Sequence, residues 1–328
     1  MEIRKESMMK KYPMKLRPVS KEILWGGSRL KERYNKSAPF AKLAESWELT
    51  VRNDGMSVID NGDYTGMTLL EYLRHAPDTI SAVRTVDPDA FPLLIKFIDA
   101  HDDLSIQVHP DDAYAREHEN SSGKMEMWYI VEATENARLV YGLRDGCTAA
   151  DFAAAVRADR IESVLRYVPV HAGECYFIPS GQIHAIGAGC LIAEIQQNCN
   201  ITYRVFDYRR KQADGTLRKL HIDEALAVTK VRTDAEIDAI RFSEKSHTPG
   251  LLCACPYFTV EKLECTHDMD LYVSEKSFTS LLVLASEGGS LLCDGKEYEL
   301  HTGDSYYLPA GLGHLRLRGP ITALASMV

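Results

Sequence analysis

The sequence GECYFIPSGQIH at residues 173–184 is nearly repeated as GDSYYLPAGLGH at residues 303–314. Both copies follow the pattern G-[DE]-x-[YF]-[YF]-[IL]-P-[SA]-G-x-x-H, and a match of this length indicates an internal duplication. In each copy the glycine and the acidic residue begin a strand after a turn, and aromatic and aliphatic residues form its middle. Proline and glycine then make a tight turn that presents a histidine. The repeat predicts two copies of one β-barrel unit.

This pattern resembles the cupin, or jelly-roll, motif. We therefore expect a mainly β fold with two cupin-like β-barrels: a catalytic, metal-binding unit over residues 1–240 and a metal-free unit over residues 241–328. The clearest helical periodicity lies in TAADFAAAVRADRIESVLRY, residues 148–167. It predicts a small helical insertion, made of two short helices broken near Asp159.

Other segments are assigned from their local patterns. TLLEYLR at residues 68–74 has apolar residues at helical spacing, and Thr68 with Glu71 matches a capping box. The residues 220–228 predict a further short helix, and the polar residues 229–250 predict a linker. FPLLIKFID at residues 91–99 is an apolar run of strand length.

The stretch LSIQVHPDDAYAREHENSSGKMEMWYI, residues 104–130, holds the side chains that indicate chemistry. Gln107 and His109 are two positions apart, so on a strand they project from the same face. Pro110 has no N–H to donate, and it therefore ends the strand pairing.

A polar loop is expected over residues 111–123, followed by a second strand over residues 124–130. On that strand Lys124, Glu126 and Trp128 share one face. Neighbouring strands would thus bring together an amide, an imidazole and a carboxylate. These ligand types suit a divalent ion such as Zn²⁺, Mn²⁺ or Fe²⁺.

The two copies of the repeat differ in what precedes them. Gln107, His109 and Glu126 stand upstream of His184. Upstream of His314, the segment FTSLLVLASEGGSLLCDGKEYEL contains no histidine. We infer that the second barrel is metal-free and that His314 is a turn histidine kept from the duplication.

The composition excludes several classes of partner. A net charge of −9 without a basic block argues against nucleic acid, and an anionic substrate would need a local positive cluster. No segment reaches the ~20 apolar residues that a membrane-spanning helix needs. The eight cysteines form no C-x-x-C pair and lie in apolar surroundings. Most are therefore expected to be core residues of a reduced, cytoplasmic protein.

Several blocks occur in one order along the chain: WGG at 25–27, ESWEL at 45–49, LSIQVHPDD at 104–112, GKMEMWYI at 123–130, FIPSGQIHAIGAG at 177–189 and LIAEIQQNCNITYRVFDY at 191–208. Together they resemble the type I phosphomannose isomerases over about Tyr12 to Tyr208, and the C-terminal barrel resembles them less. The length is similar to that of the short bacterial form, which lacks a larger helical domain. The resemblance implies the interconversion of mannose 6-phosphate and fructose 6-phosphate.

The resemblance also implies roles for individual residues. The family's zinc ligands match Gln107, His109, Glu126 and His184, which implies one Zn²⁺ per chain. The essential arginine of the family matches Arg204, and its active-site lysines and its acid ten residues before the arginine match Lys124, Lys96 and Glu194. The sequence MEMW around the glutamate ligand departs from many members, which have a small or polar residue there.

The reaction moves a proton between C2 and C1 through a cis-enediol intermediate. A Lewis-acid metal and a guanidinium, here Arg204, stabilise the oxyanion that develops. A base must take and return the carbon-bound proton, and the sequence leaves the choice between Lys124 and Glu194 open. Lys96 and Ser105 are candidate ligands of the substrate phosphate.

Two other functions remain open at this point. His109, Glu126 and His184 alone would form the two-histidine, one-carboxylate triad of a non-haem metal dioxygenase, but Gln107 and Lys124 argue against it. The other alternative is a non-catalytic homologue that binds sugar phosphates. The expected partner is a phosphorylated hexose, and the expected state is a monomer or a homodimer.

Overall fold

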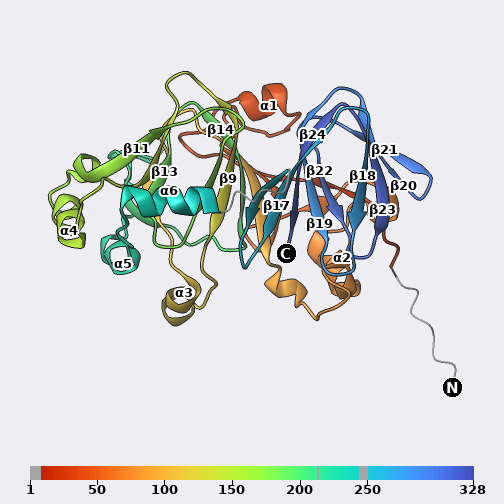
Figure 1. The fold of residues 1–328 in the computed structure, drawn as a ribbon, viewed down its shortest axis with the longest axis horizontal. Helices are drawn as coiled ribbons and strands as arrows, with labels where there is room; N and C mark the ends of the chain where they lie inside the picture. Colours follow the sequence, from red (N-terminus) through yellow and green to blue (C-terminus); the bar gives the residue numbers. More distant parts are fainter. Residues whose placement is uncertain (1–8, 213, 244–249) are drawn as a thin grey trace.

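The computed structural model describes residues 9–212, 214–243 and 250–328. They form two β-rich units that lie beside each other, with yellow and green strands in the first unit and blue strands in the second (Figure 1). The prediction of a mainly β fold with two cupin-like units is confirmed.

Two antiparallel sheets build the first unit. The six-stranded sheet has the order β12 (Cys175–Ile178), β9 (Glu126–Ala133), β14 (Cys190–Gln197), β7 (Leu93–Asp99), β3 (Glu45–Leu49), β2 (Val19–Lys21). The five-stranded sheet has the order β11 (Leu165–Pro169), β10 (Arg138–Leu143), β13 (His184–Ile186), β8 (Ile106–Val108), β15 (Tyr203–Phe206).

Two further antiparallel sheets build the second unit. The seven-stranded sheet has the order β16 (Leu251–Ala254), β17 (Thr259–Cys265), β24 (Ile321–Met327), β19 (Thr279–Ser286), β22 (Ser305–Leu308), β1 (Met14–Arg17), β6 (Val58–Ile59). The four-stranded sheet has the order β18 (Asp268–Val273), β23 (Gly313–Arg318), β20 (Gly289–Cys293), β21 (Lys296–Leu300). A separate hairpin joins β4 (Val51–Arg52) to β5 (Gly55–Met56).

Short helices lie between the strands and at the periphery (Figure 1). The α-helices are α1 (Arg29–Arg33), α2 (Leu69–His75), α3 (Asp112–Glu119), α4 (Ala149–Arg157), α5 (Ile222–Val228) and α6 (Asp234–Ser243). The 3₁₀ helices are η1 (Gly62–Tyr64), η2 (Pro77–Thr79), η3 (Pro88–Ala90) and η4 (Ile161–Val164). Among the described residues, no helix is long and apolar enough to cross a bilayer.

The strand β7 is buried along its whole length because both of its faces are covered. Leu93, Ile95 and Phe97 pack in the core that joins the first unit to the second, whereas Ile98 packs inside the first barrel. A strand covered on both faces reads as a continuous apolar run, and the prediction of a strand at residues 91–99 is confirmed. Lys96 lies in the middle of this strand, on the face that it shares with Ile98.

Two local predictions are confirmed. Thr68 caps α2 with a full capping box, in which its side chain accepts from Glu71 N and the Glu71 carboxylate accepts from Thr68 N. The helical insertion breaks at Asp159, whose φ of +53° ends α4 before η4. The second piece is therefore a 3₁₀ helix, and β11 begins within the segment that was expected to be helical.

Two segments differ from the predictions. The expected polar loop over residues 111–123 contains α3, because Asp111 caps the helix by accepting from Tyr114 N and Ala115 is buried. The expected linker over residues 229–250 contains α6, whose Ile237 packs inside the first unit. Residues 244–249 of that segment lie outside the described residues.

The strands β1 and β6 come from the N-terminal part of the chain but pair within the sheet of the second unit. Met14 on β1 pairs with Tyr307 on β22, and Leu16 pairs with Ile59 on β6. The division between residues 240 and 241 stays a proposal, and these two strands would be counted with the C-terminal unit.

Candidate metal and active site

The five-stranded sheet places three of the expected site residues on one face. Gln107 on β8 lies opposite His184 on β13 and opposite Arg204 on β15. Directly opposite residues in antiparallel strands project to the same side, with their Cβ atoms about 5 Å apart. His109 follows two positions after Gln107, immediately beyond β8. The register alone therefore brings Gln107, His184 and Arg204 together.

The six-stranded sheet supplies the remaining candidates. On β14, Glu194 lies opposite Trp128 on β9 and opposite Lys96 on β7, so the three side chains form a row across the sheet. Glu126 begins β9 two positions before Trp128 and shares its face. The two faces meet inside the first barrel, where the rings of Trp128 and His184 pack edge to face with centroids 5.3 Å apart.

His109, Glu126 and His184 form a compact buried cluster. Their candidate ligand atoms all lie within 4.8 Å of one another. Nε2 of His109 is 3.3 Å from Oε1 of Glu126, and Nε2 of His184 is 3.8 Å from Oε2. All three side chains are almost inaccessible to solvent. Among the described residues this is the cluster of histidine, cysteine and carboxylate side chains that is close enough to hold a cation.

The protonation of the two histidines suits metal binding. Burial lowers the pKa of His109 to about 3, and the adjacent Lys124 ammonium acts in the same direction. Burial also lowers the pKa of His184. Nδ1 of His184 lies 2.8 Å from the carbonyl oxygen of Gln182, so Nδ1 carries the proton and Nε2 keeps a lone pair. Both imidazoles are neutral near pH 7, which is the form that coordinates a metal.

A divalent cation fits this donor set. Oε2 of Glu126 and Nε2 of His184 are buried without a hydrogen-bond partner, and such atoms are costly unless something satisfies them. Burial raises the pKa of Glu126, but Lys124 and His109 together lower it well below its usual value. The carboxylate is therefore ionised, and one carboxylate with two neutral imidazoles is a common set for zinc or iron.

Lys124 lies directly against the cluster. Its Nζ is 2.7 Å from Oε1 of Glu126 and 3.3 Å from Nε2 of His109. The side chain is buried, although it comes from the segment before β9 rather than from the strand itself. A lysine ammonium is thus fixed beside the candidate ligand atoms of the cluster.

Glu194 and Lys96 form a buried ion pair beside Trp128. Nζ of Lys96 is 3.0 Å from Oε1 of Glu194, and Oε2 accepts a hydrogen bond of 2.9 Å from Trp128 Nε1. Burial and the nearby Glu126 raise the pKa of Glu194. Burial lowers the pKa of Lys96, but the surrounding carboxylates raise it by more. Trp128 and Lys96 thus hold both oxygens of Glu194 in place.

Glu45, which the sequence did not single out as a site residue, extends this row. Its Oε2 is 3.8 Å from Lys96 Nζ and accepts a hydrogen bond of 2.6 Å from Trp47 Nε1. Trp47 and Trp128 are both buried. The spacing of Glu45 and Trp47 on one strand face was visible in the sequence, but their relation to Lys96 depends on long-range pairing.

Arg204 and Ser105 are brought together at the edge of the five-stranded sheet. Nε of Arg204 is 3.3 Å from Oγ of Ser105, and Nη1 donates to the carbonyl oxygen of Lys219. Burial and the charge of Arg218 lower the pKa of Arg204. Lys96 lies on the opposite sheet with Glu194, so the two residues expected to bind phosphate have different partners.

Two further arginines lie near Arg204, and sequence reasoning missed them. Asp207 accepts hydrogen bonds from Arg210, with Nη2 at 2.6 Å, and from Arg218, with Nε at 2.7 Å. Arg210 and Arg218 both lower the pKa of Arg204 through their charge. The net charge of −9 is therefore accompanied by a local basic cluster, made of Arg204, Arg210 and Arg218.

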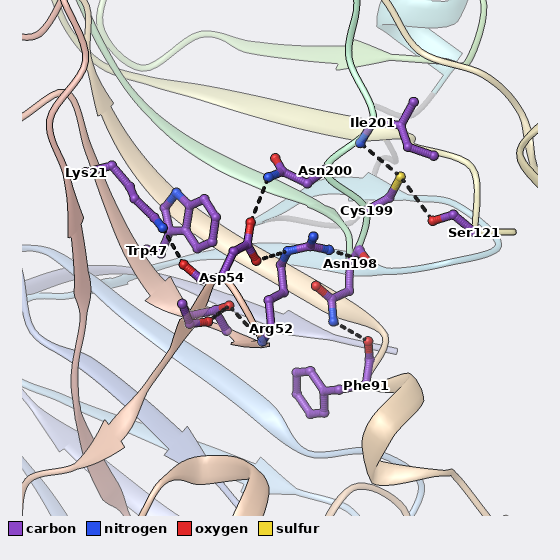
Figure 2. A network of polar contacts seen from close by, with 12 residues as sticks. Lys21, Trp47, Arg52, Asp54, Phe91, Ser121, Asn198, Cys199, Asn200 and Ile201 are labelled. Carbon is purple, nitrogen blue, oxygen red and sulfur yellow. Dashed lines mark hydrogen bonds and ion pairs between the residues drawn. The ribbon is translucent and has the colours of Figure 1, made fainter. Parts of the chain in front are cut away.

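A polar network fixes the segment that connects β14 to Arg204 (Figure 2). Asp54, in the turn between β4 and β5, accepts from Arg52 Nε at 2.9 Å and from Asn200 Nδ2 at 3.0 Å. Asn198 donates to the carbonyl oxygen of Phe91 at 2.9 Å. The hairpin thus holds the residues before β15 in place, although it contributes no side chain to the cluster.

The histidine of the second repeat lies in a different environment. His314 is exposed and packs on Tyr272, with ring centroids 4.7 Å apart. It lies on β23, and so the expectation of a turn histidine is wrong. His184 likewise begins β13. The two copies therefore share their backbone layout and differ in their chemistry.

A jelly-roll barrel that encloses a His–Glu–His cluster defines a protein of the cupin class. Two family models match this chain: the catalytic domain of type I phosphomannose isomerase over residues 14–136, and the cupin domain of mannose-6-phosphate isomerase over residues 251–328. The chain belongs to the type I phosphomannose isomerase family.

Individual relatives agree with this assignment. Mannose-6-phosphate isomerase ManA of Bacillus subtilis is 35% identical over 316 residues, which cover 96% of this chain and 98% of that protein. Mannose-6-phosphate isomerase of Streptococcus mutans is 34% identical over 316 residues, with the same shares of the two chains. The crystal structure of mannose 6-phosphate isomerase from Bacillus subtilis superposes with a TM-score of 0.87 at 33% identity, covering 96% of this chain and 99% of that one.

Proposed function

We propose that this chain interconverts mannose 6-phosphate and fructose 6-phosphate and that the interior of the first barrel is its active site. The observation that carries the proposal is that Lys124 lies against the His109–Glu126–His184 cluster, in a chain whose relatives are named mannose-6-phosphate isomerases. Arg204 and Glu194 project into the same interior from the two facing sheets.

We assign one Zn²⁺ per chain to Gln107, His109, Glu126 and His184. The unpaired buried atoms of Glu126 and His184 support this assignment, and the register places Gln107 beside His184. Bound there, the ion supplies positive charge that stabilises negative charge on a substrate oxygen. Neutral amide and imidazole ligands with a single carboxylate leave that site a net positive charge.

The residues of the chain perform the proton transfer. A base removes the proton from C2 of mannose 6-phosphate and returns it to C1 through a cis-enediol, while the hydroxyl proton on O2 passes to O1. Glu194 and Lys124 are the candidates: burial and the nearby Glu126 raise the pKa of Glu194, which makes its carboxylate a stronger base, and Lys124 is fixed beside the proposed ligands. Arg204 supplies a planar cation that stabilises the developing oxyanion.

The phosphate needs a positive anchor away from the reacting carbons, so that its binding energy fixes their position. We place it near Ser105 and the basic cluster of Arg204, Arg210 and Arg218, because Ser105 is bonded to Arg204. We also propose Lys96 as a substrate-binding residue. Its ammonium forms an ion pair with Glu194, which connects it to the site.

The decisive experiment is a coupled assay for fructose 6-phosphate formed from mannose 6-phosphate. Loss of activity with EDTA and recovery with Zn²⁺ are expected. Protein purified without added metal should contain zinc and consume no oxygen, whereas bound iron with oxygen uptake would indicate a dioxygenase. Binding of mannose 6-phosphate without turnover would indicate a non-catalytic homologue.

We further propose a cytoplasmic monomer or homodimer that binds neither nucleic acid nor membrane.

A further inference from the structure

Three consecutive backbone N–H groups before β9 each donate a hydrogen bond that is not part of the strand ladder. They belong to Gly123, Lys124 and Met125. The acceptors are Asp112 Oδ1 at 2.7 Å, Pro110 O at 3.1 Å and Gln197 Oε1 at 2.9 Å. This segment carries the Lys124 side chain to the cluster, so these bonds determine where its ammonium lies.

Asp112 is the centre of this arrangement. Besides accepting from Gly123 N, its Oδ1 accepts from Gln197 Nε2 at 3.2 Å, and its Oδ2 accepts from the Tyr257 hydroxyl at 2.7 Å. Gln197 thus bridges Asp112 to Met125. Tyr257 lies in the turn between β16 and β17 and therefore belongs to the second unit.

The backbone approaches Asp112 too closely for any other residue at position 123. A Cβ atom on Gly123 would lie 2.6 Å from the backbone of Asp111 and of Asp112. A second tie holds the same loop: Ser121 Oγ lies 3.9 Å from Cys199 Sγ, beside the network that Figure 2 shows. The loop before Lys124 is thus pinned at several points.

We propose that Asp112 is a positioning residue, which sets the Lys124 ammonium against the metal ligands, and that Tyr257 lets the second unit hold it there. The effect on catalysis rests on the proposed function, whereas the positioning of the Lys124 ammonium by Asp112 does not. It gives the second unit a role in the proposed active site of the first unit.

The expected effect follows from the tolerance of catalytic geometry. Displacement of a catalytic group by about 1 Å can lower the rate by up to about a hundredfold. Asp112→Ala removes the acceptor of Gly123 N, so we expect kcat to fall at least about tenfold while KM changes less than about twofold. Tyr257→Phe removes one hydrogen bond to Asp112, and a smaller fall is expected. Asp112→Asn keeps an oxygen for Gly123 N and should recover part of the activity.

Matched controls separate this role from general stability. Asp111→Ala removes the cap of α3, which accepts from Tyr114 N, without touching Gly123 N. Tyr272→Phe changes an exposed tyrosine of the second unit. Both controls should keep kcat, and every variant should keep one metal per chain. A fall of kcat in Asp111→Ala equal to that in Asp112→Ala would show that helix stability alone matters, which overturns the proposal.

A double-mutant cycle with Lys124→Ala tests whether Asp112 acts through the lysine. Residues that act as a unit give non-additive effects, so Asp112→Ala should change the residual kcat little when Lys124 is already absent. A second fall of the same size in the Lys124→Ala background would contradict the proposal.

Hydrogen exchange gives a readout that needs no activity. In Asp112→Ala and Tyr257→Phe, amide exchange in the segment 121–126 should become faster than in wild type and than in both controls. Unchanged exchange in both variants would overturn the proposal even if the wild-type enzyme is active. If the wild-type protein is inactive but exchange is faster in the two variants, the positioning role stands and only the isomerase function is rejected.

Discussion

Glu194 and Lys96 face each other across β14 and β7, and their charged ends lie 3.0 Å apart in the buried interior of the first barrel. Neither charge reaches solvent, and Trp128 holds the second carboxylate oxygen. A buried ion pair of this kind is costly to break by removing one partner, because the other charge is left unpaired. The pair therefore ties the stability of the barrel to Glu194, which we propose as a candidate base.

We expect Lys96→Met to lower the free energy of unfolding by about 3–5 kcal/mol, because the Glu194 carboxylate is left unpaired. The double variant Lys96→Met/Glu194→Leu removes both charges and should recover most of that loss. Chemical denaturation followed by tryptophan fluorescence measures both. A single variant as stable as wild type would mean that Lys96 and Glu194 do not form an ionised pair.

His184→Ala should abolish both metal binding and isomerase activity, because it removes one of the buried ligand atoms. His314→Ala is the matched control, since His314 occupies the corresponding position of the second repeat and is exposed. Elemental analysis should find one metal per chain in wild type and in His314→Ala and none in His184→Ala. Full metal occupancy in active His184→Ala would refute the ligand assignment.

Arg204→Lys should keep the metal and lower kcat strongly, by about 100-fold or more, because a point ammonium cannot replace the planar guanidinium at a developing oxyanion. Steady-state kinetics with a metal determination on the same sample test this. Arg33→Lys, at an exposed arginine bonded to Glu132, serves as the control. If turnover of Arg204→Lys stays close to that of wild type, Arg204 does not stabilise the transition state.

Asp207 should make a pH-dependent contribution to stability. Burial raises its pKa, but hydrogen bonds from Arg218 and Arg210 lower it by more, so the net shift is downward. A folded pKa below the unfolded value stabilises the protein above the unfolded pKa, about 4, and this stability disappears as the pH falls through the folded pKa. Asp207→Asn should thus cost about 1–3 kcal/mol at pH 7.

The difference between wild type and Asp207→Asn should shrink as the pH falls below about 4. Denaturant titrations at several pH values measure it. A difference that is constant with pH would mean that the two arginines do not stabilise the ionised carboxylate.

The repeat at residues 173–184 and 303–314 was sufficient to predict an equivalent strand followed by a turn in each unit, because turn residues and strand residues have fixed places in it. The structure forms β12 in one unit and β22 in the other at these positions, but each histidine lies on the next strand, β13 or β23, rather than in the turn. The capping box at Thr68 was equally legible, since both partners lie within four residues. Local chemistry of this kind depends on neighbours in the sequence.

What the sequence could not reveal depends on distant partners. The helix α3 is short and rich in charge. The hydrogen bonds that the Asp112 carboxylate accepts come from Gly123, Gln197 and Tyr257, which lie outside this helix. The basic cluster around Asp207 likewise needs a loop to fold back. Strand spacing indicated Gln107, His109 and Glu126 as candidate ligands, and the resemblance added His184 and Arg204; whether these residues meet could be judged only once strand register was known.

The pairing of β1 with β22 has a consequence for biosynthesis. Met14 is among the first described residues to leave the ribosome, but its partner Tyr307 emerges near the end of translation. Until then the early strand has an open edge, and open edges are sites of aggregation. The nascent polypeptide therefore depends on late synthesis, or on a chaperone, to shield that edge.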